Sequence, residues 1–99
     1  MPRWIVLAVP VDGAAEADRD ARTVTEFEGS AEEAESALVH AANTYEHSLW
    51  SVRRREIFQC SSRSYFIRIQ GRLSTFGVLI QLAELVHDSA AKPGVRPIV

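Results

Sequence analysis

The sequence predicts an α+β domain: a largely antiparallel sheet of about five strands, one main helix on one face, and a short C-terminal helix. Three observations lead to this fold class. Short runs rich in β-branched and aromatic residues occupy both halves of the chain, one capped amphipathic helix lies between them, and a polar turn separates two of the later runs. With 99 residues, the chain has the length of one domain. We expect that domain to span residues 1–89, with a loosely ordered tail at 90–99.

The N-terminal part predicts two strands separated by a polar segment. Arg3–Val9 is a continuous segment rich in β-branched residues, typical of a strand covered on both faces. Pro10 has no N–H to donate, so it should end this strand or place it at a sheet edge. Asp12–Arg22 lacks large apolar residues, and we expect a loop or a poorly anchored helical turn there. Thr23–Glu28 is short and β-favouring and predicts the second strand.

The clearest local signal is a helix from about Ala31 to Glu46. Ser30 followed by Glu33 fits a capping box, in which each side chain accepts a hydrogen bond from the other residue's backbone N–H. Further glutamates follow in the first turns, near the positive end of the helix dipole. One stripe with helical spacing is apolar and rich in alanine, so the helix can lie close to a sheet. Its members are Ala31, Ala34, Leu38, Ala41, Ala42 and Tyr45.

The C-terminal half predicts a three-stranded meander followed by a short helix. Ser51–Cys60 and Ser64–Arg72 flank the polar turn SSR, which is the layout of a β-hairpin. Leu73–Leu82 is the third run. Helical spacing then returns in the apolar residues Leu82, Leu85 and Val86.

Composition limits the possible classes of protein. The longest apolar run, Trp4–Val11, is far shorter than the roughly 20 residues of a membrane-spanning helix, and no signal-peptide layout surrounds it. We therefore expect a cytoplasmic protein without a membrane partner. A single cysteine, Cys60, cannot form an internal disulfide. The net charge of −2 hides an acidic first half and a basic second half, which can serve a partner or each other.

No group of residues predicts catalysis. Cys60 has no activating neighbour in the sequence, and the glycines are isolated, so neither a nucleophile motif nor a phosphate-binding loop is present. His40 and His47 are seven residues apart, a separation of about 10 Å along a helix, which is too wide for one metal ion. We expect no catalytic residues, no cofactor and no metal site, and hence a protein that is not an enzyme.

The segment Val52–Arg72 holds six of the eleven basic residues. Side chains alternate across a strand, so Tyr65, Ile67 and Ile69 share the side that should meet the helix, while Phe66 and Arg68 face outward. A sheet surface with arginines and an aromatic ring can bind single-stranded nucleic acid. The residues of such a site would be Arg53, Arg55, Phe66, Arg68 and Arg72. Solvated arginines beside an acidic helix explain the same pattern.

Two of the predicted strands are apolar on both faces. In the run from Phe76 to Leu82, one face is apolar throughout and Leu79 lies on the other. One helix covers one side of a five-stranded sheet, so the second side would expose apolar residues unless the acidic loop and the tail cover it. Self-association as a homodimer is the simplest way to bury such a face, and another protein is the alternative partner. The expected interaction surface consists of Ile5, Leu7, Arg53, Arg55, Phe66, Arg68 and Leu79.

Two stretches of the sequence resemble parts of known proteins. They are EFEGSAEEAESALVHAANTYEHS and RRREIFQCSSRSYFIRIQGRLSTFGVLIQLAELVHDS. The pattern from Phe27 to Ser89 resembles a group of small single-domain proteins from high-GC actinobacteria, with a capped helix, an Arg-rich strand and a closing AELV-x-D-S. The arginine-rich, lysine-poor composition agrees with such a genome. The resemblance implies a free-standing small domain and no particular activity.

Overall fold

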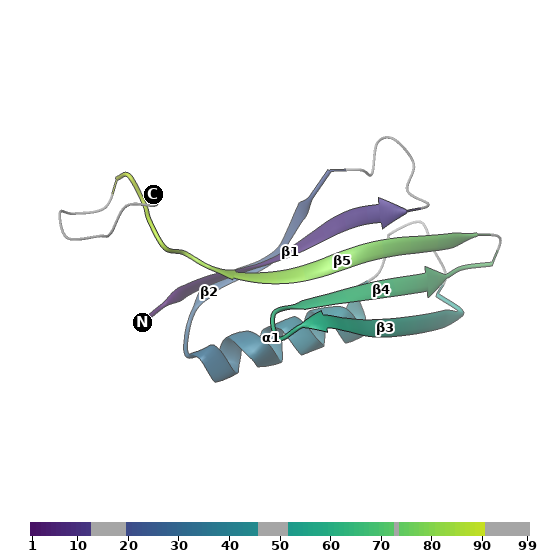
Figure 1. The fold of residues 1–99 in the computed structure, drawn as a ribbon, viewed down its shortest axis with the longest axis horizontal. Coiled ribbons are helices and arrows are strands. Elements are labelled where there is room, and N and C mark those ends of the chain that lie inside the picture. Colours follow the sequence, from purple (N-terminus) through teal and green to yellow (C-terminus); the bar gives the residue numbers. More distant parts are fainter. Residues whose placement is uncertain (13–19, 46–51, 73, 91–99) are drawn as a thin grey trace.

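The computed structural model describes residues 1–12, 20–45, 52–72 and 74–90. Within these ranges the chain forms five strands and one helix, and the strands make a single sheet in the order β2-β1-β5-β4-β3 (Figure 1). Every pair of neighbouring strands is antiparallel, which confirms the α+β class. The elements are β1 Arg3–Asp12, β2 Arg22–Glu28, α1 Ala31–Thr44, β3 Arg54–Ser61, β4 Ser64–Gln70 and β5 Thr75–Glu84.

The helix begins where the capping signal predicts. Ser30 is the N-cap; its Oγ accepts from the Glu33 N–H at 3.1 Å, and the Glu33 carboxylate accepts from the Ser30 N–H at 3.1 Å. The helix ends at Thr44, and Tyr45 caps it with an N–H donated to the Ala41 carbonyl. The expected end at Glu46 lies outside the described residues.

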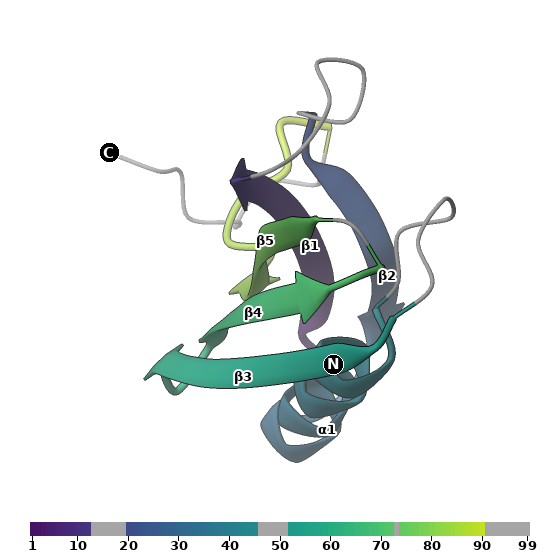
Figure 2. The same cartoon turned by 90° about the vertical axis from the view of Figure 1, so that its right-hand side faces the viewer.

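Figure 2, a view turned by 90°, shows α1 against one face of the sheet. The hydrophobic core lies between α1 and that face. Leu38 is the large side chain that α1 inserts, and its other buried residues are alanines, which bring the helix close to the strands. Trp4 closes one end of the core, and its Nε1–H donates to the Gly29 carbonyl at 3.0 Å. The strands contribute Trp4, Val6, Ala8, Ile67, Ile69, Phe76, Val78, Ile80 and Leu82 to this core.

Pro10 does not end β1, which continues to Asp12. β2 pairs with β1 only between Arg3 and Ala8, so Pro10 has one strand neighbour, β5, where it lies opposite Val78. Bonding directions alternate along an antiparallel strand, and the Arg3 carbonyl accepts from Leu85 on the β5 side. The nitrogen of Pro10 therefore points toward the side that β2 has already left. This is the edge-like position that proline tolerates.

The structure does not show the expected short C-terminal helix. Leu82 belongs to β5, which runs to Glu84, and Leu85 extends the ladder with an N–H donated to Arg3. Residues 85–88 form no regular element. The two-residue alternation of buried side chains along β5 continues through Leu82. Burial of Leu82 in the sheet core therefore favours a strand over the helix that the spacing of Leu82, Leu85 and Val86 predicts. The tail expected at 90–99 lies outside the described residues beyond Ala90.

Most of the expected loop between Asp12 and Arg22 also lies outside the described residues. In the part of the chain that the structure describes, no helix has both the length and the apolar character needed to cross a membrane.

Candidate interaction face of the sheet

The sheet has a second face, on the side opposite α1, which we call the open face. Side chains next to the buried ones along each strand point to this side, because successive residues alternate. No helix among the described residues lies against it. Its large apolar side chains are Ile5, Leu7, Val9, Phe58, Phe66 and Leu79.

Four of these side chains form a row across the sheet. Val9 lies opposite Leu79, Leu79 opposite Phe66, and Phe66 opposite Phe58, so the row crosses β1, β5, β4 and β3. The rings of Phe58 and Phe66 have centroids 6.1 Å apart and are tilted by 34°, a favourable aromatic geometry. Phe58 is 43% exposed although the Phe66 ring lies beside it. The row is suited to packing against another apolar surface.

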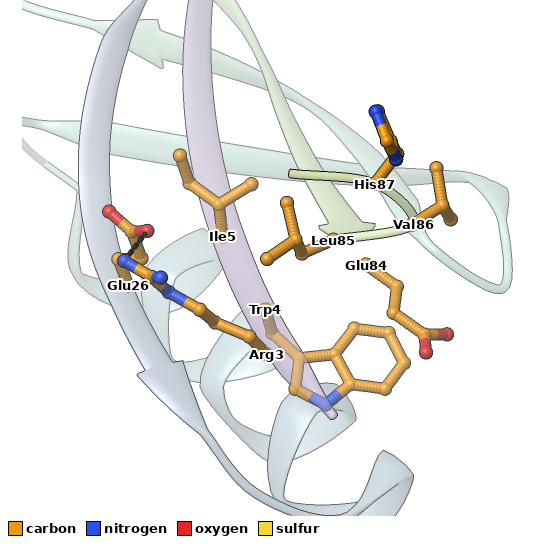
Figure 3. A pocket seen from close by; sticks show the side chains of 8 residues that line it. All are labelled: Arg3, Trp4, Ile5, Glu26, Glu84, Leu85, Val86 and His87. Carbon is orange, nitrogen blue, oxygen red and sulfur yellow. Dashed lines mark ion pairs between the residues drawn. The ribbon is translucent and has the colours of Figure 1, made fainter. Parts of the chain in front are cut away.

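A pocket of about 290 Å³ lies where β1 and β2 meet the residues after β5 (Figure 3). Ile5, Leu85 and Val86 form its apolar part, and the ion pair between Arg3 and Glu26, with an N–O distance of 2.8 Å, lies at its side. This volume is at the lower end of the roughly 300–1,000 Å³ of small-molecule sites, so the pocket suits one inserted side chain better than a cofactor.

His87 also lines this pocket. Its Nδ1 is buried and has no hydrogen-bond partner among the described residues. Leu85 and Val86 beside it are 47% and 60% exposed. The apolar surface of the open face therefore continues beyond Ile5 into these residues.

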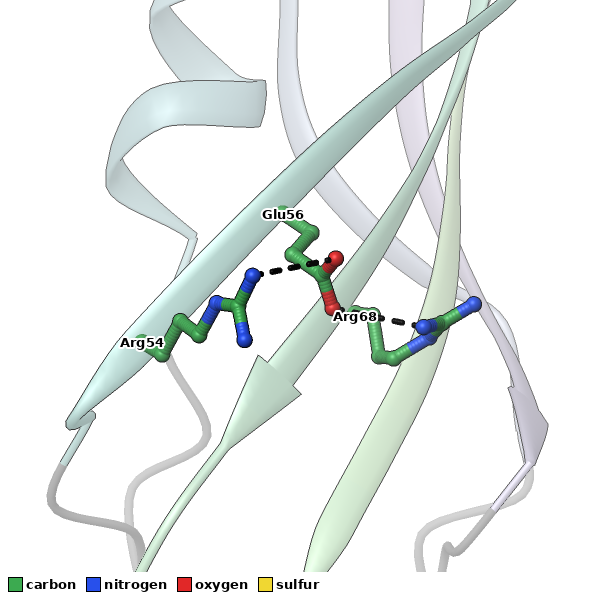
Figure 4. A network of polar contacts seen from close by, with 3 residues as sticks. All are labelled: Arg54, Glu56 and Arg68. Atoms are coloured by element: carbon green, nitrogen blue, oxygen red, sulfur yellow. Dashed lines mark hydrogen bonds and ion pairs between the residues drawn. The ribbon is translucent and has the colours of Figure 1, made fainter.

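At the other end of the open face, one carboxylate holds two guanidinium groups (Figure 4). Glu56 lies 3.6 Å from Arg54 and 3.3 Å from Arg68, measured between nitrogen and oxygen. The Arg68 guanidinium also lies 5.2 Å from the centre of the Phe58 ring. Exposed ion pairs contribute only about 0–1 kcal/mol each. Their main effect here is on charge, since the three side chains together carry +1 instead of the +2 of the two arginines.

The structure brings together five of the seven residues expected at the interaction surface. Ile5, Leu7, Phe66, Arg68 and Leu79 lie on the open face. The other two do not join them there: Arg53 precedes β3, and its backbone N–H donates to Gln70, while Arg55 lies on the helix side.

The position of Arg55 follows from the hairpin register. Arg55 lies opposite the buried Ile69, and its Nη1 donates to the Ala42 carbonyl at 3.1 Å. Arg54, which the sequence interpretation left out, takes the place on the open face. The signal that identifies it is the cross-strand pairing with β4, which the sequence of β3 alone does not contain.

The side chains considered for catalysis are dispersed. Cys60 is exposed near the end of β3, with its Sγ 4.0 Å from the Phe58 carbonyl oxygen, and His40 is exposed on α1. Across the described ranges, no three His, Cys, Asp or Glu side chains lie close enough together to hold a metal ion. His47 lies outside these ranges.

Comparison of the chain with protein-family models, with curated proteins and with solved structures found no match. The resemblance to small actinobacterial proteins stays a prediction. The open face is therefore the basis for inferring a function.

Proposed function

We propose that this chain is a small non-catalytic interaction or regulatory domain that forms a homodimer through its open face. The observation that carries the proposal is the row of Val9, Leu79, Phe66 and Phe58, which continues toward Ile5 and Leu7 on a side that α1 does not cover. Monomeric proteins rarely expose a contiguous apolar patch larger than a few hundred Å², and this row crosses four of the five strands. A cytoplasmic location agrees with this proposal.

A second copy is the partner that this face fits best. Leu79 lies on β5, the middle strand of the five, so a two-fold axis near Leu79 superimposes the apolar rows of two copies. Two sheets packed in this way form a sandwich about 10 Å thick. The charged groups around the row pair within the chain, Arg3 with Glu26 and Arg68 with Glu56, which limits repulsion between copies.

The size of the face predicts the strength of the dimer. Five strands spaced about 4.8 Å apart, each with about seven residues rising about 3.3 Å, present on the order of 500 Å². Stable complexes bury about 800 Å² on each partner. We therefore expect a concentration-dependent dimer, with a Kd in the micromolar range or above.

Sedimentation velocity from about 1 to about 500 µM tests the proposal. The wild type should shift from monomer to dimer with rising concentration, and Leu79→Arg should remain monomeric because it places a charge at the centre of the face. Val39→Arg is the matched control: it adds the same charge on the exposed side of α1, where Val39 is 45% exposed, and it should dimerise like the wild type. A wild-type chain that stays monomeric over this range would contradict the proposal.

A second candidate function is binding of single-stranded nucleic acid by the same face. The observation that favours it is the pair of Phe58 and Phe66 with the Arg68 guanidinium beside the Phe58 ring. Nucleic-acid bases stack on such aromatic rings whatever their sequence. Glu56 offsets part of the positive charge, which weakens this candidate relative to self-association. Fluorescence anisotropy with labelled dT and dA oligonucleotides at about 50 mM salt tests it, and absence of binding there would remove it.

A further inference from the structure

A second surface lies at the opposite edge of the sheet from β3. Within the described residues, β2 pairs only with β1, so its outer side is an edge. The Gly29 N–H donates to the Pro2 carbonyl at 3.0 Å, and bonding directions alternate along an antiparallel pair. By this alternation Phe27 bonds to β1, while the backbone N–H and C=O groups of Glu26 and Glu28 point outward.

A groove of about 480 Å³ runs beside this edge, between β2 and α1. Thr25 and Phe27 line it from the strand, and Ala37 and Ala41 line it from the helix. The two alanines are short, which leaves space above them, and Phe27 and Ala37 pack against the core beneath. An extended chain placed next to β2 would direct every second side chain into this groove.

The carboxylates around this edge give it a negative charge. Glu28 is exposed and makes no ion pair with any residue that the structure describes, and Glu33 lines the groove. Glu26 is paired with Arg3. Pairing of β2 with its own copy would bring these carboxylates together, and like charges on paired strands are destabilising. The charge favours a basic partner instead.

We propose that β2 and α1 bind an extended peptide in which apolar and basic residues alternate, added antiparallel to β2 as a sixth strand. The basic side chains lie beside Glu26 and Glu28, and the apolar side chains enter the groove next to Phe27 and Thr25. Backbone hydrogen bonds to Glu26 and Glu28 supply affinity, and the groove selects the side chains. This site lies at the β2 edge, apart from the row of Val9, Leu79, Phe66 and Phe58, and it does not rest on the homodimer.

Fluorescence anisotropy with one defined probe tests the proposal: acetyl-Lys-Val-Lys-Val-Lys-Val-Lys-amide carrying a fluorophore. In the proposed register the lysine N–H groups donate to β2 and the valine N–H groups face solvent. N-methylation of the lysine backbone nitrogens should abolish binding, and N-methylation of the valine nitrogens should leave it nearly unchanged. Equal binding by both methylated peptides, or loss only with methylated valines, would overturn the proposal, as would no binding of the unmodified probe at about 1 mM.

Variants of the protein locate the site. Glu28→Lys should weaken binding about threefold or more, while Glu35→Lys, the same charge change on the exposed side of α1, should have a smaller effect. Leu79→Arg on the open face should leave peptide binding unchanged. If Leu79→Arg removed binding and Glu28→Lys did not, the peptide would lie on the open face and the proposed site would be wrong. Anisotropy measures peptide binding and sedimentation measures dimerisation. Failure of the proposed peptide site can therefore be distinguished from failure of the proposed homodimer.

Discussion

Arg55 of strand β3 donates a hydrogen bond from its Nη1 to the main-chain carbonyl of Ala42 in α1, at 3.1 Å and in a partly buried position. Ala42 is one of the last four helical residues, and the carbonyls of these residues have no N–H donor within the helix. The last turn of α1 contains no basic residue of its own. A guanidinium from an edge strand therefore supplies the positive charge that the C-terminal end of a helix favours, and it ties that strand to the helix layer.

We expect Arg55→Ala to lower the free energy of unfolding by about 1–2 kcal/mol, because it removes a charge-assisted hydrogen bond and leaves the Ala42 carbonyl without this partner. Urea denaturation followed by circular dichroism measures the change. Arg54→Ala is the control, since the side chain of Arg54 is 64% exposed and its ion pair with Glu56 is on the surface. Equal losses in the two variants would contradict the role given to Arg55.

The same residue shows where sequence interpretation reaches its limit. The alternation of Arg53 and Arg55 against Arg54 is readable in the sequence, but strand β3 has no apolar alternation to say which set faces the helix. Its register is set by pairing with β4 and shifts between Gln59 and Ser61, next to the hairpin turn. A shift of one residue exchanges the two faces of a strand. The structure places Arg55 on the helix side, opposite Ile69, and Arg54 on the open face beside Glu56.

The parts of the fold with strong local signals were predicted correctly. The capping box fixed the start of α1, and Ile67 and Ile69 are buried against the helix layer as the alternation in β4 indicates. The end of β5 was not predicted, because Leu82, Leu85 and Val86 satisfy helical spacing as well as a strand end. Backbone pairing with Arg3, a contact with the other end of the chain, decides in favour of the strand.

The capping box gives a second prediction. Ser30→Ala should lower the free energy of unfolding by about 1 kcal/mol, because the Glu33 N–H loses its acceptor at the helix start. Ser36→Ala, an exposed position inside α1, should be neutral or slightly stabilising, since alanine has the higher helix propensity. Thermal unfolding of both variants in the same buffer compares them. A loss in Ser36→Ala as large as that in Ser30→Ala would show that the hydroxyl at the cap has no special role.

Neighbouring residues in α1 provide a third prediction. Leu38 is 1% exposed and is the one large side chain that α1 inserts between its buried alanines, so Leu38→Ala leaves a cavity against the sheet. We expect a loss of about 2–5 kcal/mol, which for a domain of this size removes much of the stability. Val39→Ala, one residue further along, should change stability by less than about 0.5 kcal/mol because Val39 faces solvent. Chemical denaturation distinguishes these outcomes, and similar losses in both would mean that α1 packs by a different face.

Glu56 gives a prediction about assembly rather than stability, and it rests on the proposed homodimer. Glu56→Gln keeps the size of the side chain but removes the negative charge between Arg54 and Arg68, so this part of the open face rises from +1 to +2. Two copies facing each other then repel more strongly, and we expect the dimer Kd to rise severalfold at about 20 mM salt. At about 0.5 M salt the difference from wild type should largely disappear, because the Debye length falls to a few ångströms.

Sedimentation equilibrium at both salt concentrations measures the dimer Kd, with Glu35→Gln on the outer side of α1 as the control for loss of one carboxylate. An unchanged or lower Kd for Glu56→Gln at low salt would show that this end of the open face does not approach the second copy.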